Sequence, residues 1–375
     1  MLTPPRAPDI GLREADRWEW RRGDGGDPVA LAAAFLGERG FAVDPLGTRP
    51  TAPAETAGAA LLLGAAALPA DLATMAPAAP SPCPAVPDAV VVVYERAAEP
   101  PPEPPQRPVG LGPWTLSWTA AQHADAAEKV RQAIARGDLY QANVVGHRSA
   151  PVTGEPADVA RLLRAVPGTP YAGSLAGDGW SVHSASPEAF LEIRDGVATV
   201  RPIKGTAADP ATLRASAKDR AEHVMIVDLE RNDLGRVAVP GTVRVPTLYD
   251  VLPRAGVWHA ESTVEARLRP GSTLAEVLGA TFPGGSVTGA PKRAALQLLH
   301  DLEPVGRGPS MGAFGWVDPD GTVDLGLTIR TLAMADGRLH LWTGGGVTWG
   351  SDPDAEVAEA DAKAAPILRA LADRD

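Results

Sequence analysis

Three short stretches of β-forming residues follow one another within some twenty positions of this chain, and they constrain its fold more than any other feature. They cover residues 180–184, 189–194 and 197–202, with turn signals at Gly177-Asp178-Gly179 and Asp195-Gly196. Further strand candidates are separated by long helical patterns, but strands and helices do not alternate one for one. Strands in hairpin-like succession, interrupted by helices, predict an α+β fold with helix-covered sheets rather than a repeated βαβ array.

The remaining elements follow from hydrophobic periodicity and from helix start and stop signals. Residues 119–136 read as an amphipathic helix with apolar Ala126, Val130 and Ile134 on one face, ended by Gly137. By the same criteria we expect helices over 28–40, 157–165, 213–229, 273–281, 293–302 and 354–372, and strands over 89–94, 257–268, 311–317, 323–333 and 339–343.

Composition excludes several classes of partner and compartment. Lys and Arg number 35 against 46 Asp and Glu, and no basic block interleaves with aromatic residues, so nucleic acid is not an expected partner. The single cysteine, Cys83, excludes a disulfide framework. The first residues lack an apolar signal region, and the most apolar run, 59–70, is too short to cross a bilayer. We therefore expect a cytoplasmic protein without a membrane segment.

A proline-rich stretch indicates the domain organisation. Residues 49–108 are dense in proline and alanine, and the run from Pro100 to Pro105 has the character of polyproline II. We place a boundary there. The prediction is an N-terminal proline- and alanine-rich α/β segment over 1–110 and a regular catalytic domain over 111–375.

Lys204 is the first candidate for chemistry. It lies in the run Arg201-Pro202-Ile203-Lys204-Gly205-Thr206, where Pro202 fixes φ and Gly205 permits backbone shapes that other residues avoid. Such a segment can direct one side chain into a cleft, where a lysine can lose its proton near neutrality and act as a nucleophile or base. The alternative is an ordinary solvent-exposed loop lysine.

Two pairs of acids have a spacing that suits a metal ion. Asp219 and Glu222, and likewise Glu356 and Glu359, are three residues apart on predicted helices and so share a helix face. If the two helices meet, carboxylates without cysteine or clustered histidine form a hard oxygen site suited to Mg²⁺. The alternative is a pair of solvated helix faces, with Glu359 and Lys363 as a simple i, i+4 ion pair.

Glu188 follows a predicted strand and a proline, with apolar neighbours on both sides. Apolar surroundings raise the pKa of a carboxylic acid and suit it to general acid catalysis. A turn glutamate in water is the other interpretation.

Two glycine-rich segments suggest anion binding without matching a nucleotide motif. Gly284 and Gly289 have P-loop spacing, but Ala290 stands where the P-loop lysine is required. The run Gly344–Gly346 follows a strand without opening a helix. Backbone N–H groups of such segments can approach an anion closely, and Arg330 is a candidate to bind a carboxylate.

Taken together, the segments from about Trp114 to the C-terminus resemble the chorismate-utilising enzymes, the family of anthranilate synthase component I, aminodeoxychorismate synthase component I, and the isochorismate and salicylate synthases. The resemblance implies a pair of antiparallel sheets sandwiched between helices (α/β/β/α). It rests on seven segments in the family's order: Ser184-Ala185-Ser186-Pro187-Glu188, Pro202-Ile203-Lys204-Gly205-Thr206, Lys218-Asp219-Arg220-Ala221-Glu222-His223, the run from Asp228 to Gly235, the run from Phe282 to Lys292, Thr328-Ile329-Arg330-Thr331 and Gly344-Gly345-Gly346-Val347.

The resemblance also implies roles for individual residues. Glu222 and Glu359 are expected to bind Mg²⁺, which holds the ring carboxylate of chorismate, with Asp219 and Glu356 in support. Glu188 is expected to act on the leaving 4-hydroxyl. The predicted substrate-binding set comprises Gly205, Thr206, His259, Thr288, Arg330, Gly344, Gly345 and Gly346, of which Arg330 and the three glycine amides hold the enolpyruvyl carboxylate and His259 and Thr288 line the ring.

Lys204 selects the branch of the family, because anthranilate synthases usually carry alanine at this position and aminodeoxychorismate synthases carry lysine. The expected activity is conversion of chorismate and ammonia to 4-amino-4-deoxychorismate, the precursor of p-aminobenzoate and folate, with a separate glutaminase subunit as the source of ammonia. The alternatives are anthranilate synthase component I, aminodeoxyisochorismate synthase, or a non-catalytic binding partner that keeps the fold. Tyr140, Gln141 and Asn143 keep a further part of the family pattern.

Overall fold

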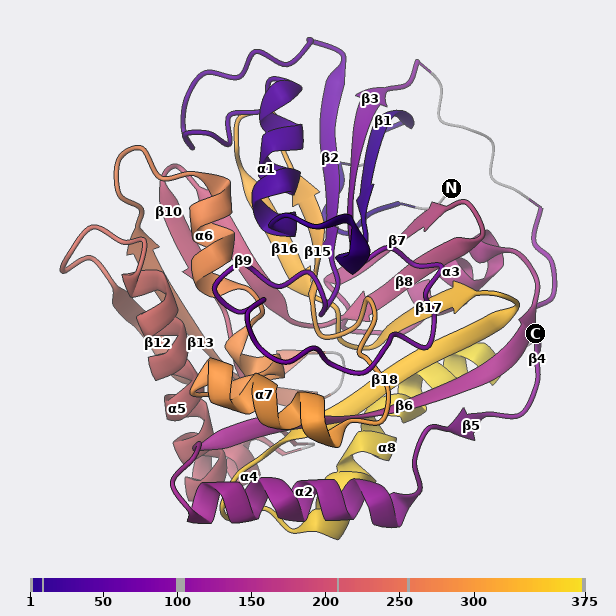
Figure 1. The fold of residues 1–375 in the computed structure, drawn as a ribbon, viewed down its shortest axis with the longest axis vertical. Helices are drawn as coiled ribbons and strands as arrows, with labels where there is room; N and C mark the ends of the chain where they lie inside the picture. Colours follow the sequence, from indigo (N-terminus) through magenta and orange to yellow (C-terminus); the bar gives the residue numbers. More distant parts are fainter. Residues whose placement is uncertain (1–2, 9, 99–104, 208, 255–256, 373–375) are drawn as a thin grey trace.

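Two antiparallel sheets stacked on one another form the centre of the molecule (Figure 1). The computed structural model describes residues 3–8, 10–98, 105–207, 209–254 and 257–372. The larger sheet contains β1 (Leu12–Trp20), β2 (Thr56–Leu63), β3 (Ala89–Arg96), β9 (Ala189–Arg194), β10 (Val197–Val200), β11 (Ile203–Ala207), β12 (Arg244–Arg254), β13 (Val257–Arg267), β15 (Ala313–Val317) and β16 (Val323–Leu327). The smaller sheet contains β4 (Gly110–Leu111), β5 (Thr115–Leu116), β6 (Gln141–Thr153), β7 (Tyr171–Gly177), β8 (Trp180–Ser186), β14 (Gly289–Ala290), β17 (Thr331–Ala335) and β18 (Arg338–Val347).

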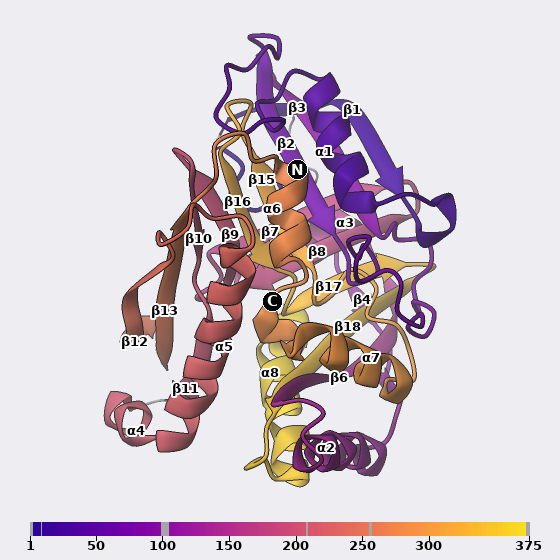
Figure 2. The same cartoon turned by 60° about the vertical axis from the view of Figure 1, so that its left-hand side comes forward.

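Helices cover the outer faces of both sheets. The larger sheet is packed by α1 (Pro28–Glu38), α4 (Pro210–Ala215), α5 (Ala217–Gly235) and α6 (Leu274–Thr281), and the smaller by α2 (Ala120–Ala135), α3 (Pro156–Arg164), α7 (Lys292–Leu302) and α8 (Pro353–Ala372). Figure 2 shows α5 along the larger sheet and α8 along the smaller one. The predicted α+β fold, with antiparallel sheets between helices, is confirmed.

The main core lies between the facing sheets. It joins side chains of the larger sheet, such as Leu61 and Phe314, to Val182 and Trp342 of the smaller one, and all four are buried. Burial of this much apolar surface is the main force that holds the two sheets together.

The N-terminal strands are part of the larger sheet. β2 pairs with β3 on one side and with β15 on the other, so that Leu61 lies opposite Gly315. The proposed boundary between residues 110 and 111 falls within the short strand β4.

Three predicted elements differ from the structure. The helix expected over 213–229 is two helices, because Ser216 caps a new one: its Oγ accepts a hydrogen bond from the Asp219 amide at 3.1 Å. The strand expected over 323–333 is two strands in different sheets, separated by a turn in which Arg330 has φ of 49°. The glycine run Gly344–Gly346 continues β18 instead of forming a loop.

In the described ranges no helix combines the length and the apolar character needed to cross a bilayer.

Candidate active site

Lys204 lies at a bulge in β11. The register of β11 against β13 shifts between Lys204 and Thr206, and Gly205 adopts φ of 79°, a left-handed conformation that glycine accepts without strain. The half-buried lysine donates a hydrogen bond from Nζ to the carbonyl oxygen of Ser286 at 3.2 Å. Burial lowers the pKa of Lys204, and the nearby charge of Glu188 opposes this shift. The bulge thus holds the amine in a dry environment that favours its neutral, nucleophilic form.

Glu188 lies between β8 and β9 and is only 6% exposed. Its Oε1 accepts a hydrogen bond from the backbone amide of Ile203 at 3.3 Å, which places it one residue from Lys204 along the neighbouring segment. Burial raises the pKa of the Glu188 carboxyl, with Lys204 opposing the shift. Burial therefore shifts the pKa of each group toward its neutral form, while the charge of each opposes the shift of the other.

The loop between Gly284 and Thr288 forms one wall of this site. Its conformation is held by Glu230, whose Oε1 accepts from the Gly285 amide at 3.0 Å, and by buried Arg307, which donates to the Val287 carbonyl at 2.8 Å. The hydroxyl of Thr288, predicted to line the ring site, donates to the Gly284 carbonyl at 2.8 Å and is buried. In this structure the Thr288 side chain therefore stabilises the loop that carries the Ser286 carbonyl.

The predicted acid pairs approach from two helices. Glu222 on α5 accepts a hydrogen bond from the Thr348 hydroxyl at 3.0 Å, just after β18. Glu356 and Glu359 on α8 lie beside Gly345: a methyl group at Gly345 would come within 2.8 Å of Glu356 Oε2 and 3.6 Å of Glu359 Oε1. Glu222 and Glu359 both act electrostatically on Lys204.

Asp219 lies on α5, one turn before Glu222. Its side chain faces Gly205, where a methyl group would approach the Asp219 Cβ to 3.5 Å. Asp219 therefore borders the bulge of β11.

The oxygen atoms of the four predicted ligands are of the kind that binds a magnesium ion. All four predicted ligands are carboxylates, the hard oxygen donors that Mg²⁺ prefers. In the described residues no three or more of these side chains are already arranged as a metal cluster. A lysine contacts one of these carboxylates. The Nζ atom of Lys363 forms an ion pair with Glu359 at 2.6 Å and donates a hydrogen bond to the Gly344 carbonyl at 2.9 Å. These carboxylates fit a hard cation, and Lys363 neutralises one of them.

The three glycines form the floor of the site, and each permits a close approach. A methyl group at Gly344 would collide with the Val144 carbonyl oxygen at 1.9 Å. At Gly346 it would lie 2.4 Å from the Gln141 amide nitrogen and 3.5 Å from Lys204 Nζ. Glycine is therefore required on this strand because side chains from β6 and β11 converge above it.

Arg330 immediately precedes β17, the strand that pairs with β18 on the side opposite β6. The register of the two strands begins at the Leu332–Leu341 pair, and continued by two residues it places Arg330 opposite Thr343, next to the glycine run. Its half-buried guanidinium makes no hydrogen bond or ion pair within the described part of the chain, and burial lowers its pKa. The left-handed backbone at Arg330 is the kind of local strain that recurs at ligand sites.

His259 is buried in β13, and its backbone lies opposite Thr206 of β11. The Thr206 side chain lies outside the described part of the structure. The backbone pairing places His259 beside the bulge that carries Lys204.

Sequence reasoning missed two side chains at this site. Gln141 is fully buried against Gly346, and neither its amide nitrogen nor its oxygen has a hydrogen-bond partner among the described residues. His223 is fully buried on α5, and its pKa falls to about 4, mainly through burial and also through the charge of Lys204. The Tyr-Gln-x-Asn pattern was a signal for Gln141, but only the fold shows that its amide is buried against Gly346 without a partner among the described residues.

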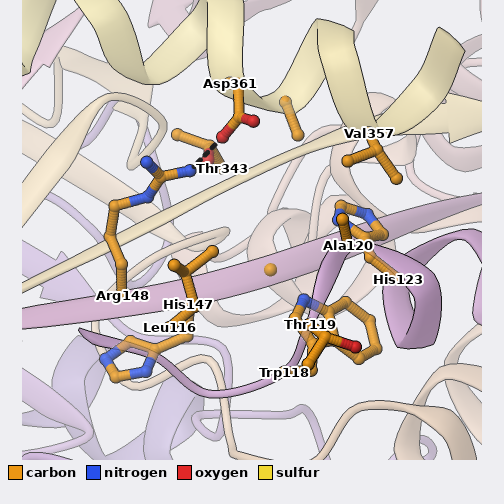
Figure 3. Close-up of a pocket in the computed structure, with 12 residues that line it drawn as sticks. Leu116, Trp118, Thr119, Ala120, His123, His147, Arg148, Thr343, Val357 and Asp361 are labelled. Atoms are coloured by element: carbon orange, nitrogen blue, oxygen red, sulfur yellow. Dashed lines mark hydrogen bonds and ion pairs between the residues drawn. The ribbon is translucent and has the colours of Figure 1, made fainter. Parts of the chain in front are cut away.

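A separate small cavity of about 40 Å³ lies between α2, β6 and α8 (Figure 3). Trp118 stacks on His123 with ring centroids 4.7 Å apart, and Arg148 pairs with Asp361 at 2.6 Å. Burial lowers the pKa of His123. None of the predicted site residues lines this cavity.

Comparison with known proteins decides the family. A family model described as chorismate binding enzyme matches residues 72–369. The chain belongs to the chorismate-binding enzymes. The match covers Lys204, Glu188 and both acid pairs, and confirms the family expected from the sequence segments.

Two kinds of chorismate-binding enzyme are similar to the chain to almost the same degree. It is 41% identical to anthranilate synthase component 1 of Streptomyces coelicolor over 70% of its length, and 39% identical to aminodeoxychorismate synthase component 1 of Klebsiella aerogenes over 69%. The chain spans 53% and 59% of the length of these relatives. The crystal structure of anthranilate synthase component I from Streptococcus pneumoniae has the same fold, with a TM-score of 0.80, 23% identity, and coverage of 96% of this chain and 92% of that one.

Proposed function

We propose that this chain is the chorismate-aminating component of an aminodeoxychorismate synthase. The observation that carries the proposal is Lys204: its amine is held beside Gly346 and the Ser286 carbonyl, next to the buried carboxyl of Glu188. An amine biased toward its neutral form and an acid biased toward its protonated form suit a substitution in which hydroxide must leave.

The proposed steps use these two residues. Lys204 forms a bond to C2 of chorismate as the C4–O bond breaks, and Glu188 transfers its proton to the departing oxygen, which leaves as water. Ammonia then forms a bond to C4, and the bond between C2 and Lys204 breaks. The product is 4-amino-4-deoxychorismate. Burial of Glu188 keeps bulk water away from the electrophilic ring.

Charged groups around the pair suit the two carboxylates of chorismate. Arg330 and the adjacent edge of β18 would hold the enolpyruvyl carboxylate through a guanidinium and backbone amides. Glu222 and Glu359, supported by Asp219 and Glu356, would hold Mg²⁺, which supplies charge neutralisation at the ring carboxylate when it is bound. Lys363 would then have to release Glu359, its present partner.

A partner subunit belongs to the proposal, because the chain offers no activated cysteine to release ammonia from glutamine. Two of the relatives carry names that end in component 1. We therefore expect a separate glutaminase to deliver ammonia to the Lys204 site.

Identification of the product tests the proposal. Purified protein is incubated with chorismate, Mg²⁺ and ammonium at pH 8.5, and the products are separated by chromatography. We expect 4-amino-4-deoxychorismate. Fluorescent anthranilate would instead identify the chain as an anthranilate synthase component, and unconsumed chorismate would favour a non-catalytic binding partner.

A further inference from the structure

Glu230 lies behind the Lys204 site and has no part in the steps described so far. It is on α5 and 5% exposed, and its Oε1 accepts the Gly285 amide hydrogen. Its Oε2 is buried without a hydrogen-bond partner among the described residues. A buried carboxyl oxygen without a partner is costly, and such groups in proteins usually contact an ordered water.

A small internal cavity joins Glu230 to Glu188. Its volume of about 10 Å³ is close to what a single water molecule requires. Both carboxyl groups line it, together with Ser286 and the apolar side chains of Phe190, Val200 and Leu327. Because Glu188 and Glu230 line the same space, and that space is about the size of one water, a single water there is the natural bridge between the two acids.

The charged surroundings of Glu230 favour a bound proton. On its own helix Asp233 is three residues away, and Lys292 at the start of α7 pairs with Asp233 at 2.8 Å. Glu188 faces it across the cavity, and Arg201, which also lines the cavity, is paired with Glu192 at 2.6 Å. Burial, and then the charge of Asp233, raise the pKa of Glu230 to about 8.

Asp233, whose charge acts on Glu230, also borders a pocket at the surface. A surface pocket of about 290 Å³ is lined by Asp233, Lys292 and Arg236. Asp233 is therefore the group through which we expect Glu230 to exchange protons with solvent.

The proposed function creates a need for one proton in each turnover. Glu188 loses its proton to the leaving oxygen, which becomes water. Ammonia enters with three N–H bonds, and the product keeps them as an ammonium group, so no proton returns to Glu188. Since Glu188 is buried and faces the substrate, it must be reprotonated from behind or after the product has left.

We infer that Glu230 is a positioning and proton-supplying residue that reprotonates Glu188 through one water in the cavity between them. Glu230 transfers a proton to this water, the water transfers one to Glu188, and Glu230 regains its proton from solvent past Asp233 and Lys292. This inference rests on the proposed function for two points, the loss of the 4-hydroxyl and the ammonium group that the product keeps.

Glu230→Gln tests the relay, because glutamine keeps an oxygen that can accept the Gly285 amide but cannot supply the proton. Rapid-quench measurements with chorismate and ammonium follow the first and later turnovers. We expect the first turnover to keep the wild-type rate, because Glu188 starts protonated, and the steady-state rate to fall about tenfold or more. The progress curve would then show a burst of about one product per enzyme.

Glu303→Gln is the matched control. Glu303 is equally buried and holds the same loop through Arg307, to which it is paired at 2.7 Å, but it does not line the cavity. We expect this variant to slow first and later turnovers alike, without a burst. The same pattern in Glu230→Gln would show that Glu230 only supports the loop and would overturn the relay, as would unchanged steady-state turnover.

Ala189→Val provides a second test that leaves both acids in place. Ala189 lines the cavity, so the added methyl groups take the space of the water. We expect the same burst and slow steady state, and normal turnover in this variant would overturn the relay even if Glu230→Gln did not fold. Release of anthranilate by the wild-type protein would refute the proposed function and with it the need for the relay, because the neutral amine of anthranilate gives a proton back. Formation of 4-amino-4-deoxychorismate without a burst in these variants would refute the relay alone.

Discussion

The side-chain nitrogen of Lys204 lies 3.2 Å from the carbonyl oxygen of Ser286, across a gap of some eighty residues in sequence. The contact joins β11 of the larger sheet to the loop before β14 of the smaller one. Glu230 fixes that loop from behind, through the Gly285 amide. The position of the amine therefore depends on both sheets, and substitutions on either one are expected to move it.

Gly346→Ala should inactivate the protein without unfolding it. The added methyl group would meet the Gln141 amide at 2.4 Å and Lys204 Nζ at 3.5 Å, so the side chains above the strand must move. We expect chorismate turnover to fall about 100-fold, since small misplacements of reacting groups have effects of this size. Gly350→Ala is the control, because a methyl group there meets nothing within 4 Å. Equal activity of the two variants would show that Gly346 does not border the reaction site.

The metal site makes a prediction that does not depend on turnover. Glu222→Gln and Glu359→Gln should each weaken Mg²⁺ binding in titration calorimetry about tenfold, because a hard cation loses a charged ligand. Glu128→Gln is the control, because Glu128 is half-buried on α2, where it contacts Arg131 and Gln132 and none of the predicted ligands. Mg²⁺ binding that is the same in all three variants would rule out these carboxylates as the ligands.

Much of this site was predictable because its residues occur in short segments whose chemistry is local. A lysine between Pro202 and Gly205, and acids three apart on a helix, carry their signal in the sequence itself. The fold showed that β11, the 284–288 loop and β18 bring these segments together.

Other features could not be predicted, because they depend on packing over long range. The chain leaves the larger sheet after β16 and enters the smaller sheet at β17. The sequence Ile329-Arg330 carries no turn signal, and the change of direction coincides with the left-handed backbone of Arg330. Likewise the sequence of β2 shows no alternation of apolar and polar residues, because both faces of this strand are buried. The side-chain amide of Gln141 and the Oε2 atom of Glu230 are buried without hydrogen-bond partners among the described residues. No local sequence pattern reveals such burial.

The burial of Glu230 predicts how stability changes with pH. Its pKa is raised in the folded state, so its contribution to stability is fully present below its ordinary value of 4.5 and is lost as the pH rises through about 8. Glu230→Gln removes this loss, which is on the order of 1 kcal/mol per pH unit within that range. We therefore expect the Tm of the wild type to fall between pH 5 and pH 8 more steeply than that of the variant, by differential scanning calorimetry. Parallel curves would contradict the burial of an isolated acid at this position.

Cys83 should have no role in nitrogen chemistry. It is 1% exposed in the main core, and burial raises the pKa of its thiol to about 11, so the reactive thiolate is scarce at neutral pH. We expect the chain to use ammonium but not glutamine, and Cys83→Ser to leave ammonium-dependent turnover unchanged. Release of ammonia from glutamine by the purified chain would reveal a second active site that the account lacks.

The most direct test of the account is the rate at which wild type and Lys204→Ala form 4-amino-4-deoxychorismate from chorismate, Mg²⁺ and ammonium, measured by chromatography of the product. Lys129→Ala, which removes an exposed lysine paired with Asp125, is the control for loss of a surface charge. The account predicts that Lys204→Ala lowers the rate at least about 100-fold while its circular dichroism and Tm stay close to wild type, because the amine supplies chemistry rather than packing. Formation of the product at the wild-type rate by Lys204→Ala would contradict the central claim that this lysine is the nucleophile.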